Sequence, residues 1–220
     1  MKKMIKCLLG VLMVTALTGC GTKQAEPQPS PSAETEQPAA EQTEKKTLVV
    51  CFSRAGENWE VGVVEKGNTM IAAEYIAQQT GADLFVIEPE KPYPENYMET
   101  VNIASEEKSS KARPAIKNTC ENWDAYTDII MGYPIWHGDL PMIMYTFMES
   151  YDFTGKTVYP FDTHGGSGLS GTVESIRNTA KGAEVMKGLA LSGKSMQNEF
   201  DSQKGAIDQW LKDSGLVKAE

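Results

Sequence analysis

Short apolar runs recur at intervals along most of the chain. Four of them are continuous, and they cover residues 48–52, 84–87, 128–132 and 157–161. A fifth run, at 184–191, is weaker because Gly188 interrupts it. Continuous apolar runs of this length are typical of strands buried on both faces, as in parallel sheets. The pattern therefore predicts five buried strands.

Apolar residues recur at helical spacing between and after these runs. This spacing predicts helices over 68–79, 142–151, 170–179 and 201–214. Strands that alternate with helices imply a parallel sheet with right-handed crossovers. The predicted fold class is α/β, with a doubly wound five-stranded parallel sheet in a three-layer α/β/α sandwich.

The first twenty residues have the pattern of an export signal. Three lysines precede an apolar stretch, 7–17, which is shorter than the roughly 20 residues that a membrane-spanning helix needs. The Leu-Thr-Gly-Cys-Gly segment at 17–21 resembles the lipobox of bacterial lipoproteins. In that family the cysteine, here Cys20, is lipidated and becomes the new N-terminus. An ordinary signal peptide with a chance cysteine is the alternative. We expect residues 1–20 to be a lipoprotein signal peptide.

The segment after this signal is built differently from the rest of the chain. Residues 21–45 are rich in proline and glutamate and contain no aromatic side chain. Such a segment cannot bury enough apolar surface to fold, so we expect a disordered linker. The remaining residues, 46–220, are enough for one domain with a full core. These features together predict a protein that is lipid-anchored to the cell membrane on its extracytoplasmic side.

Charge and cysteine content narrow the function classes. The formal net charge is -9, and removal of residues 1–20 takes away three lysines and no acid, which leaves -12. This balance argues against a nucleic-acid partner, whose phosphates need a basic surface. Cys51 and Cys120 remain, which are too few for a disulfide framework and lack metal-ligand spacing. Cys51 lies in an apolar run and is expected to be buried, and a single bridge between the two cysteines stays open.

Doubly wound sheets bind ligands beyond the carboxyl ends of their strands, where the strand order reverses. The loops after the first, third and fourth predicted strands are therefore the candidate site. The first loop begins with Ser53 and Arg54, and Gly-Asn-Thr at 67–69 then opens a helix. Hydroxyls and free N–H groups at a helix N-terminus suit a phosphate. Simple capping by Asn68 explains the same segment equally well.

The other two loops have the composition of a site for a flat ligand. The loop at 132–141 carries Trp136 and His137, and a planar aromatic ligand could rest on its backbone or on the indole. A core tryptophan with a solvated histidine is the alternative. The loop at 162–168 combines three glycines with hydroxyl and imidazole donors, which lets its backbone approach the edge of a ring. A flexible surface turn is the alternative there.

The three loops, in this order and after these strands, resemble the flavodoxin family. The segments that carry the resemblance are 53–54, 67–69, 132–136 and 163–168, and it extends over residues 46 to about 216. They are similar in particular to the flavodoxin-like proteins that many bacteria carry, some of them as lipoproteins. The resemblance implies a 2-1-3-4-5 strand order and FMN as the cofactor.

The resemblance also implies which residues contact FMN. The phosphate would be held by Ser53, Arg54, Asn68 and Thr69. The isoalloxazine would be flanked by Pro134, Ile135, Trp136 and His137 and by Thr163, His164, Gly165, Gly166 and Ser167. One departure from the family is the insert 55–66, which splits the phosphate loop. This insert either loops out, with Trp59 near the ring, or changes how the phosphate is held.

A bound flavin would supply the chemistry, so no catalytic side chain is expected. The sequence has no acceptor motif for covalent flavin, which favours non-covalent FMN. We expect electron transfer or flavin-dependent reduction at the outer face of the membrane, with a redox partner protein or a small acceptor such as a quinone. Whether the protein is an electron carrier or an FMN-dependent oxidoreductase, linked to a quinone or to NAD(P)H, stays open. The alternative is a non-redox flavodoxin-like binding module exported as a lipoprotein. A further hypothesis is that His137 or His164 donates a hydrogen bond to the N1–C2=O edge of the flavin.

Overall fold

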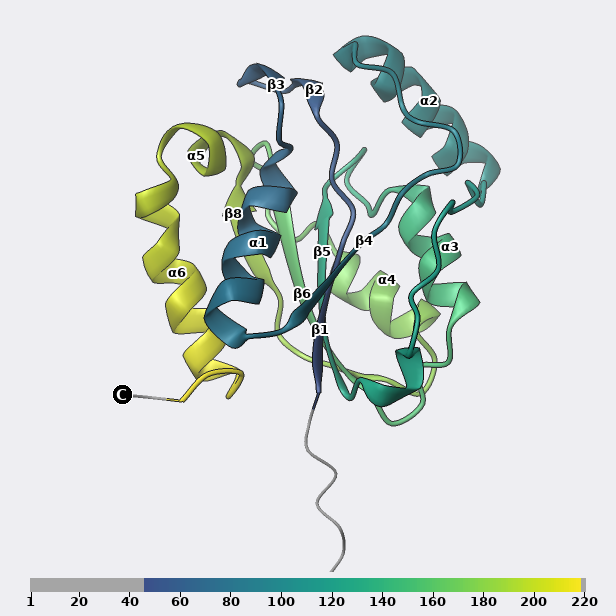
Figure 1. The fold of residues 1–220 in the computed structure, drawn as a ribbon. Coiled ribbons are helices and arrows are strands. Elements are labelled where there is room, and N and C mark those ends of the chain that lie inside the picture. The colour runs from purple at the N-terminus through teal and green to yellow at the C-terminus, as the bar shows by residue number, and fades with distance from the viewer. Residues whose placement is uncertain (1–45, 219–220) are drawn as a thin grey trace, which may run out of the picture. The chain divides into compact units, whose positions relative to one another are not determined.

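The computed structural model describes residues 46–218 (Figure 1). The predicted signal peptide with Cys20 and the predicted linker, 21–45, lie outside the described residues and stay predictions. Within the described range, no helix has the length and apolar character that crossing a membrane requires.

A parallel sheet forms the middle layer of the fold (Figure 1). Its strands are β1 (Thr47–Cys51), β4 (Asp83–Val86), β5 (Asp128–Pro134), β6 (Thr157–His164), β7 (Glu184–Val185) and β8 (Leu189–Ser192). Their order is β4-β1-β5-β6-β7, with β8 also paired to β6, and every pairing is parallel. In the numbering of the predicted strands this is the order 2-1-3-4-5, so the predicted doubly wound α/β fold is confirmed.

Two central strands run further than the apolar runs predict. β5 continues to Pro134 and β6 to His164. Pro134 pairs with Thr163 at the end of this ladder. Several residues that the sequence assigns to ligand loops therefore belong to the sheet, where the ladder fixes their positions.

The predicted fifth strand is in fact two short strands. β7 pairs with the start of β6 and β8 with its end. Gly188 lies between them, and a Cβ atom there would come within 2.8 Å of the Leu169 side chain. A side chain at residue 188 would therefore require the Leu169 and Val173 side chains to shift, and the strand breaks where its apolar pattern is weakest.

Helices cover both faces of the sheet (Figure 1). α1 (Asn68–Thr80), α5 (Gly193–Asn198) and α6 (Phe200–Asp213) cover one face, and α3 (Met142–Ser150) and α4 (Thr172–Thr179) cover the other. β1 supplies both cores by alternation, because Val49 packs in the cluster with α1 and α6 residues while Val50 packs in the cluster with α3 residues. Cys51 and Cys120 are buried and free, so the bridge left open by the sequence is absent.

Four features have no counterpart in the sequence pattern. They are an antiparallel hairpin of β2 (Gly56–Asn58) and β3 (Gly62–Val64), helix α2 (Tyr97–Ser110), a 3-10 turn at Trp123–Ala125 and the short helix α5. The hairpin and α2 stand at the carboxyl edge of the sheet, at the top of Figure 1. Only Thr100 and Ala104 of α2 are buried, so the helix has no apolar stripe to reveal it.

Substitution of alanine for glycine should have opposite effects on the stability of the fold at two positions. A Cβ atom at Gly132, in β5, would come within 2.1 Å of the edge of the Phe161 ring, whereas one at Gly205, in α6, would meet nothing within 4 Å. We expect Gly132→Ala to lower the free energy of unfolding by about 1–3 kcal/mol, because it overpacks the core. Gly205→Ala should raise it by about 0.5–1 kcal/mol, because it removes backbone freedom from the unfolded chain. Urea unfolding followed by circular dichroism measures both, and equal effects would contradict the packing shown here.

Candidate functional site

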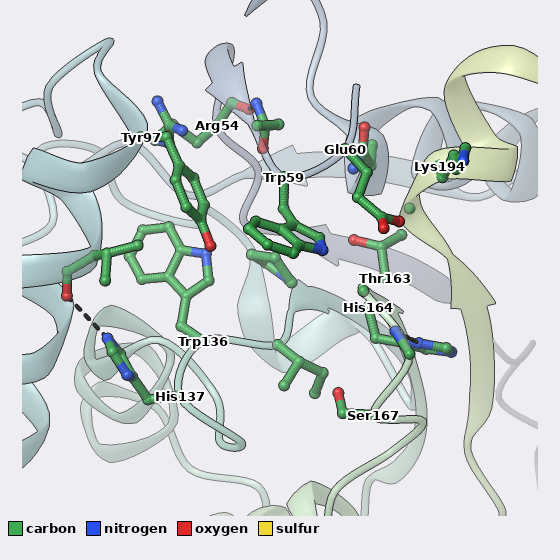
Figure 2. Close-up of a pocket in the computed structure, with 18 of the residues that line it drawn as sticks. Arg54, Trp59, Glu60, Tyr97, Trp136, His137, Thr163, His164, Ser167 and Lys194 are labelled. Carbon is green, nitrogen blue, oxygen red and sulfur yellow. Dashed lines mark hydrogen bonds between the residues drawn. The ribbon is translucent and has the colours of Figure 1, made fainter. Parts of the chain in front are cut away.

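A pocket of about 560 Å³ opens at the carboxyl edge of the sheet (Figure 2). Its wall comes from the ends of β5 and β6, the loop after β1, the β2–β3 hairpin, α2 and the start of α5. The lining residues are Arg54, Asn58, Trp59, Glu60, Asn68, Tyr97, Thr100, Val101, Ala104, Pro134, Ile135, Trp136, His137, Gly138, Thr163, His164, Gly165, Gly166, Ser167, Ser192, Gly193 and Lys194. All three loops singled out from the sequence therefore contribute to one cavity.

The start of α1 is packed directly onto the end of β1. Gly67 precedes the helix, and a Cβ atom there would collide with the Arg54 backbone and the Ser53 hydroxyl. The Ser53 hydroxyl accepts a hydrogen bond from the N–H of Met70 at 3.1 Å. Asn68, the residue that the capping alternative assigns to the cap, is the first residue of the helix, and Gly67 has its cap position. The first N–H groups of a helix have no partner within it, so a helix start that reaches the pocket, as α1 does at Asn68, suits an anion.

Two predicted phosphate residues stand behind the pocket wall. Ser53 and Thr69 do not line the cavity. Thr69 is buried, and its hydroxyl shares a 2.7 Å hydrogen bond with the hydroxyl of Thr163. This bond ties the first turn of α1 to the end of β6. Ser53 and Thr69 thus fix the position of the helix N-terminus from behind.

Arg54 is engaged with backbone carbonyls rather than free in the cavity. Its guanidinium donates to the carbonyls of Ala55, Glu57, Pro94 and Glu95. These bonds join the hairpin to the segment that leads into α2. Because most of its donors are used in this way, Arg54 is a cross-link in the wall with little left to offer a phosphate.

The hairpin and α2 are joined to each other and cover one side of the pocket. The Glu57 carboxylate accepts hydrogen bonds from the Tyr97 N–H at 2.9 Å and the Asn96 amide at 3.1 Å. Trp59 lies at the tip of the hairpin with its ring centroid 5.8 Å from that of Tyr97. A Cβ atom at Gly165 would come within 2.8 Å of the Trp59 ring, so the indole lies directly over that backbone. The insert 55–66 thus folds back over the site with Trp59 inside it, as Figure 2 shows.

The end of β5 is held in place by several hydrogen bonds. The Ile135 N–H donates to the Thr163 carbonyl, which continues the ladder to β6. The next turn is closed by two backbone bonds between Trp136 and Asp139. His137 has a left-handed backbone with φ of 50°, and its Nε2 is 2.9 Å from the Val101 carbonyl of α2. Trp136 therefore stands in a rigid turn that is itself bonded to α2.

The end of β6 brings a neutral imidazole to the pocket. The Nδ1 atom of His164 accepts a hydrogen bond from the Gly166 N–H at 2.8 Å. Burial lowers the pKa of His164 below its ordinary value. An imidazole that is neutral and accepts at Nδ1 carries its proton on Nε2. His164 thus keeps one donor for a ligand, whereas the Nε2 of His137 is already bonded to α2.

The sequence did not identify three groups of lining residues. They are Asn58 and Glu60 of the hairpin, the α2 residues Tyr97, Thr100, Val101 and Ala104, and Ser192, Gly193 and Lys194 at the start of α5. Trp59 was anticipated only in the alternative that places the insert near the ring. Two N-cap residues in the sequence indicate where the helices of the last two groups begin. Asn96 caps α2 by accepting from the Glu99 N–H, and Ser192 caps α5 by accepting from the Ser195 N–H.

Comparison with known proteins gives a consistent result. The model of the flavodoxin family matches residues 61–211. A putative flavoprotein from Bacteroides eggerthii is 33% identical, with 79% of this chain and 99% of that chain covered and a TM-score of 0.61. A putative flavoprotein from Bacteroides uniformis is 32% identical, with coverages of 76% and 98% and a TM-score of 0.61. A flavoprotein from Lactobacillus acidophilus, solved in complex with FMN, shares the fold at 23% identity, with coverages of 76% and 98% and a TM-score of 0.54. No curated protein matches the chain.

One buried carboxyl group lies next to the site. Asp162 precedes Thr163 in β6 and is fully buried, and neither carboxylate oxygen has a hydrogen-bond partner. Burial raises its pKa to about 8, against a smaller opposing contribution from the backbone at Leu191. The group is therefore protonated and neutral at pH 7.

This carboxyl group makes stability depend on pH in a defined direction. Between the unfolded pKa of about 4 and the folded pKa of about 8, the folded protein binds one more proton than the unfolded chain. Asp162 therefore lowers stability as pH rises through this window, by at most about 1.4 kcal/mol for each pH unit. We expect Asp162→Asn to unfold at a clearly higher urea concentration than the parent at pH 8 and at a similar one at pH 5. Asp201→Asn, which changes an exposed carboxylate, is the control. If the difference in urea midpoint between Asp162→Asn and the parent does not grow with pH, the raised pKa of Asp162 is contradicted.

Proposed function

The chain belongs to the flavodoxin family, and from that premise we propose that it binds FMN non-covalently and transfers electrons at the outer face of the membrane. The observation that carries the proposal is that the loops after β1, β5 and β6 meet in one pocket at the carboxyl edge. Ligands of doubly wound sheets bind at this edge. The Lactobacillus acidophilus flavoprotein, which has the same fold, is a complex with FMN.

The phosphate of FMN fits the N-terminal end of α1. The helix offers the N–H groups of its first residues, and its dipole favours an anion there. Gly193 lies against the Asn68 amide, and the next residue, Lys194, also lines the pocket. We assign to Lys194 the positive charge for the phosphate that the sequence had assigned to Arg54. The Arg54 guanidinium instead holds the hairpin in place.

The isoalloxazine fits the part of the pocket between the ends of β5 and β6. Trp59 and Trp136 offer flat apolar surface there (Figure 2). Gly165 lets the backbone come close to a ring, since any side chain at this position meets Trp59. His164 can donate from Nε2 to a carbonyl or a ring nitrogen. These residues orient the cofactor and keep water from it.

When it is bound, FMN supplies redox chemistry in one- or two-electron steps. The protein therefore needs no catalytic triad and no metal. The partners that we propose are a redox protein or a small acceptor, since both suit a pocket that opens at the edge of the sheet.

We extend the proposal to the place of action. The basic, apolar and small-residue pattern of residues 1–20 supports export, and Cys20 supports a lipid anchor. The polar segment 21–45 gives the domain reach along the membrane surface. An acidic surface would steer a basic redox partner to the anchored domain.

The role of Lys194 is tested with two flavins. We expect the full chain to retain FMN after desalting and to show the yellow flavin absorption band. Lys194→Ala should weaken FMN binding about tenfold, because a charge-assisted hydrogen bond contributes about 1.5 kcal/mol. The same variant should bind riboflavin, which lacks the phosphate, as tightly as the parent does. Quenching of flavin fluorescence measures both affinities.

The matched control for Lys194 is Lys181→Ala. Lys181 is exposed and lies before β7, at the amino end of the strands and away from the pocket. The Lys181→Ala protein should bind FMN as tightly as the parent does. A protein that stays colourless after incubation with FMN refutes the proposed cofactor. Equal losses for FMN and riboflavin in Lys194→Ala refute only the phosphate role.

The lipid anchor is tested at Cys20. In a bacterial host that processes lipoproteins, the parent should incorporate a labelled fatty acid and sediment with membranes. Cys20→Ser should do neither, because the thiol that carries the diacylglyceryl group is gone. Labelling of the Cys20→Ser protein at the parental level would show that the lipid is attached elsewhere or that the signal belongs to another class.

A further inference from the structure

The two sides of the pocket have different chemistry. The side formed by α1, the end of β6 and α5 is polar, with Asn68, Thr163, His164, Ser192 and Lys194. It is the side that we assign to FMN. The side formed by the hairpin tip, α2 and the end of β5 is mainly apolar and aromatic, although Asn58, Glu60, Thr100 and His137 also line it. We call its apolar and aromatic residues the α2 wall: Trp59, Tyr97, Val101, Ala104, Ile135 and Trp136.

The α2 wall is a built surface and not a loose flap. His137 bonds to the Val101 carbonyl, and Lys108 donates to the His137 carbonyl at 2.7 Å, so α2 is tied to the end of β5 at two points. Its first turn is tied to the hairpin through Glu57. Trp136 packs edge-on against Phe52, with ring centroids 5.5 Å apart, which fixes its ring from behind. The wall therefore keeps its shape without a ligand.

The α2 wall also discourages anions. A helix N-terminus ordinarily attracts phosphate, but the first N–H of α2 donates to the Glu57 carboxylate and that of Glu99 donates to Asn96. The carboxylate already takes the place that an anion would take. The six residues of the α2 wall carry no formal charge. The nearest cation of the pocket lining on this side is Arg54, whose guanidinium is bonded to four backbone carbonyls. A dinucleotide with two phosphates therefore finds few free cationic donors here.

Apolar side chains continue from this wall to the protein surface. Trp59 is 56% exposed, Met98 57% and Val63 80%. They are three of the four large hydrophobic side chains that are exposed among residues 46–218, and they belong to the hairpin and the first turn of α2. Exposed apolar side chains on the elements that line a pocket are consistent with an apolar ligand there.

We propose that the α2 wall is a subsite for an uncharged, planar electron acceptor of the quinone class. Such a molecule would lie flat against the aromatic side chains of the wall, next to the place assigned to FMN. Its reduction to the hydroquinone takes two electrons and two protons, which reduced FMN supplies as it returns to the oxidised form. This subsite rests on the proposed function, because without FMN the bound quinone has no electron donor.

Binding is tested first, without turnover. Isothermal titration calorimetry of the oxidised, FMN-loaded full chain is run with a neutral naphthoquinone and with its sulfonated analogue. We expect the neutral quinone to bind at least tenfold more tightly, because the wall offers the sulfonate no counter-charge. Val101→Lys places an ammonium group in the wall and should cut this preference about tenfold.

The matched control is Asn102→Lys. Asn102 is the next residue of α2, and it is exposed and does not line the pocket. This variant adds the same charge to the same helix and should leave the preference unchanged. FMN titration of each variant checks that the cofactor site is intact, since neither residue belongs to the polar side.

The second readout is anaerobic reoxidation of the reduced protein in a stopped-flow instrument. The rate should saturate with the neutral quinone and follow the same order of variants as the affinities. The proposal is wrong if the neutral quinone and its sulfonated analogue bind with nearly equal affinity. It is also wrong if Val101→Lys leaves the ratio of the two affinities unchanged. Failure of the FMN proposal is seen separately as a colourless protein, and calorimetry of that protein still shows whether the wall binds the quinone.

Discussion

The close contact between Gly67 and the backbone of Arg54 is the constraint on which the site depends. Because Gly67 has no side chain, α1 begins directly against the end of β1, and the Ser53 hydroxyl can cap it from behind. The same placement brings Thr69 within hydrogen-bond distance of Thr163. Three loops that are far apart in the sequence are thereby held at one edge of the sheet. Any side chain at residue 67 would push the helix away and open all of these contacts together.

The insert 55–66 adds a second side to this edge. It leaves the sheet after Arg54 and returns at Gly67, so its two ends are held by the same close contact. Arg54 bonds the hairpin to the segment before α2, and Glu57 bonds it to the first turn of α2. A surface that the sheet alone would leave open to solvent thus becomes a pocket with a polar side and an apolar side. The feature that departs most from the family pattern is the one that encloses the site.

The elements that are buried could be predicted from the sequence, whereas those held mainly by polar contacts could not. The strand order and the three loops could be predicted, because continuous apolar runs identify buried strands and the fold class then locates the ligand edge. The hairpin and α2 could not, because they bury little of their surface and leave no periodic apolar pattern. The sequence also does not reveal that the Arg54 guanidinium bonds to carbonyls, since those partners lie some forty residues away. Asp162 reads as a polar loop residue, yet β6 extends past it and buries it.

Burial also sets the electrostatics of the site. It keeps the Asp162 carboxyl protonated and His164 neutral at pH 7, so neither of these neighbouring side chains carries a charge. A ring held beside the end of β6 is therefore surrounded there by dipoles, from the backbone of the glycine-rich segment and the His164 N–H, with no fixed ions among them. The charged side chains that line the pocket are Arg54, Glu60 and Lys194, and the Arg54 guanidinium is already bonded to backbone carbonyls. The uncharged surroundings at the end of β6 thus follow from where the chain buries its ionisable groups.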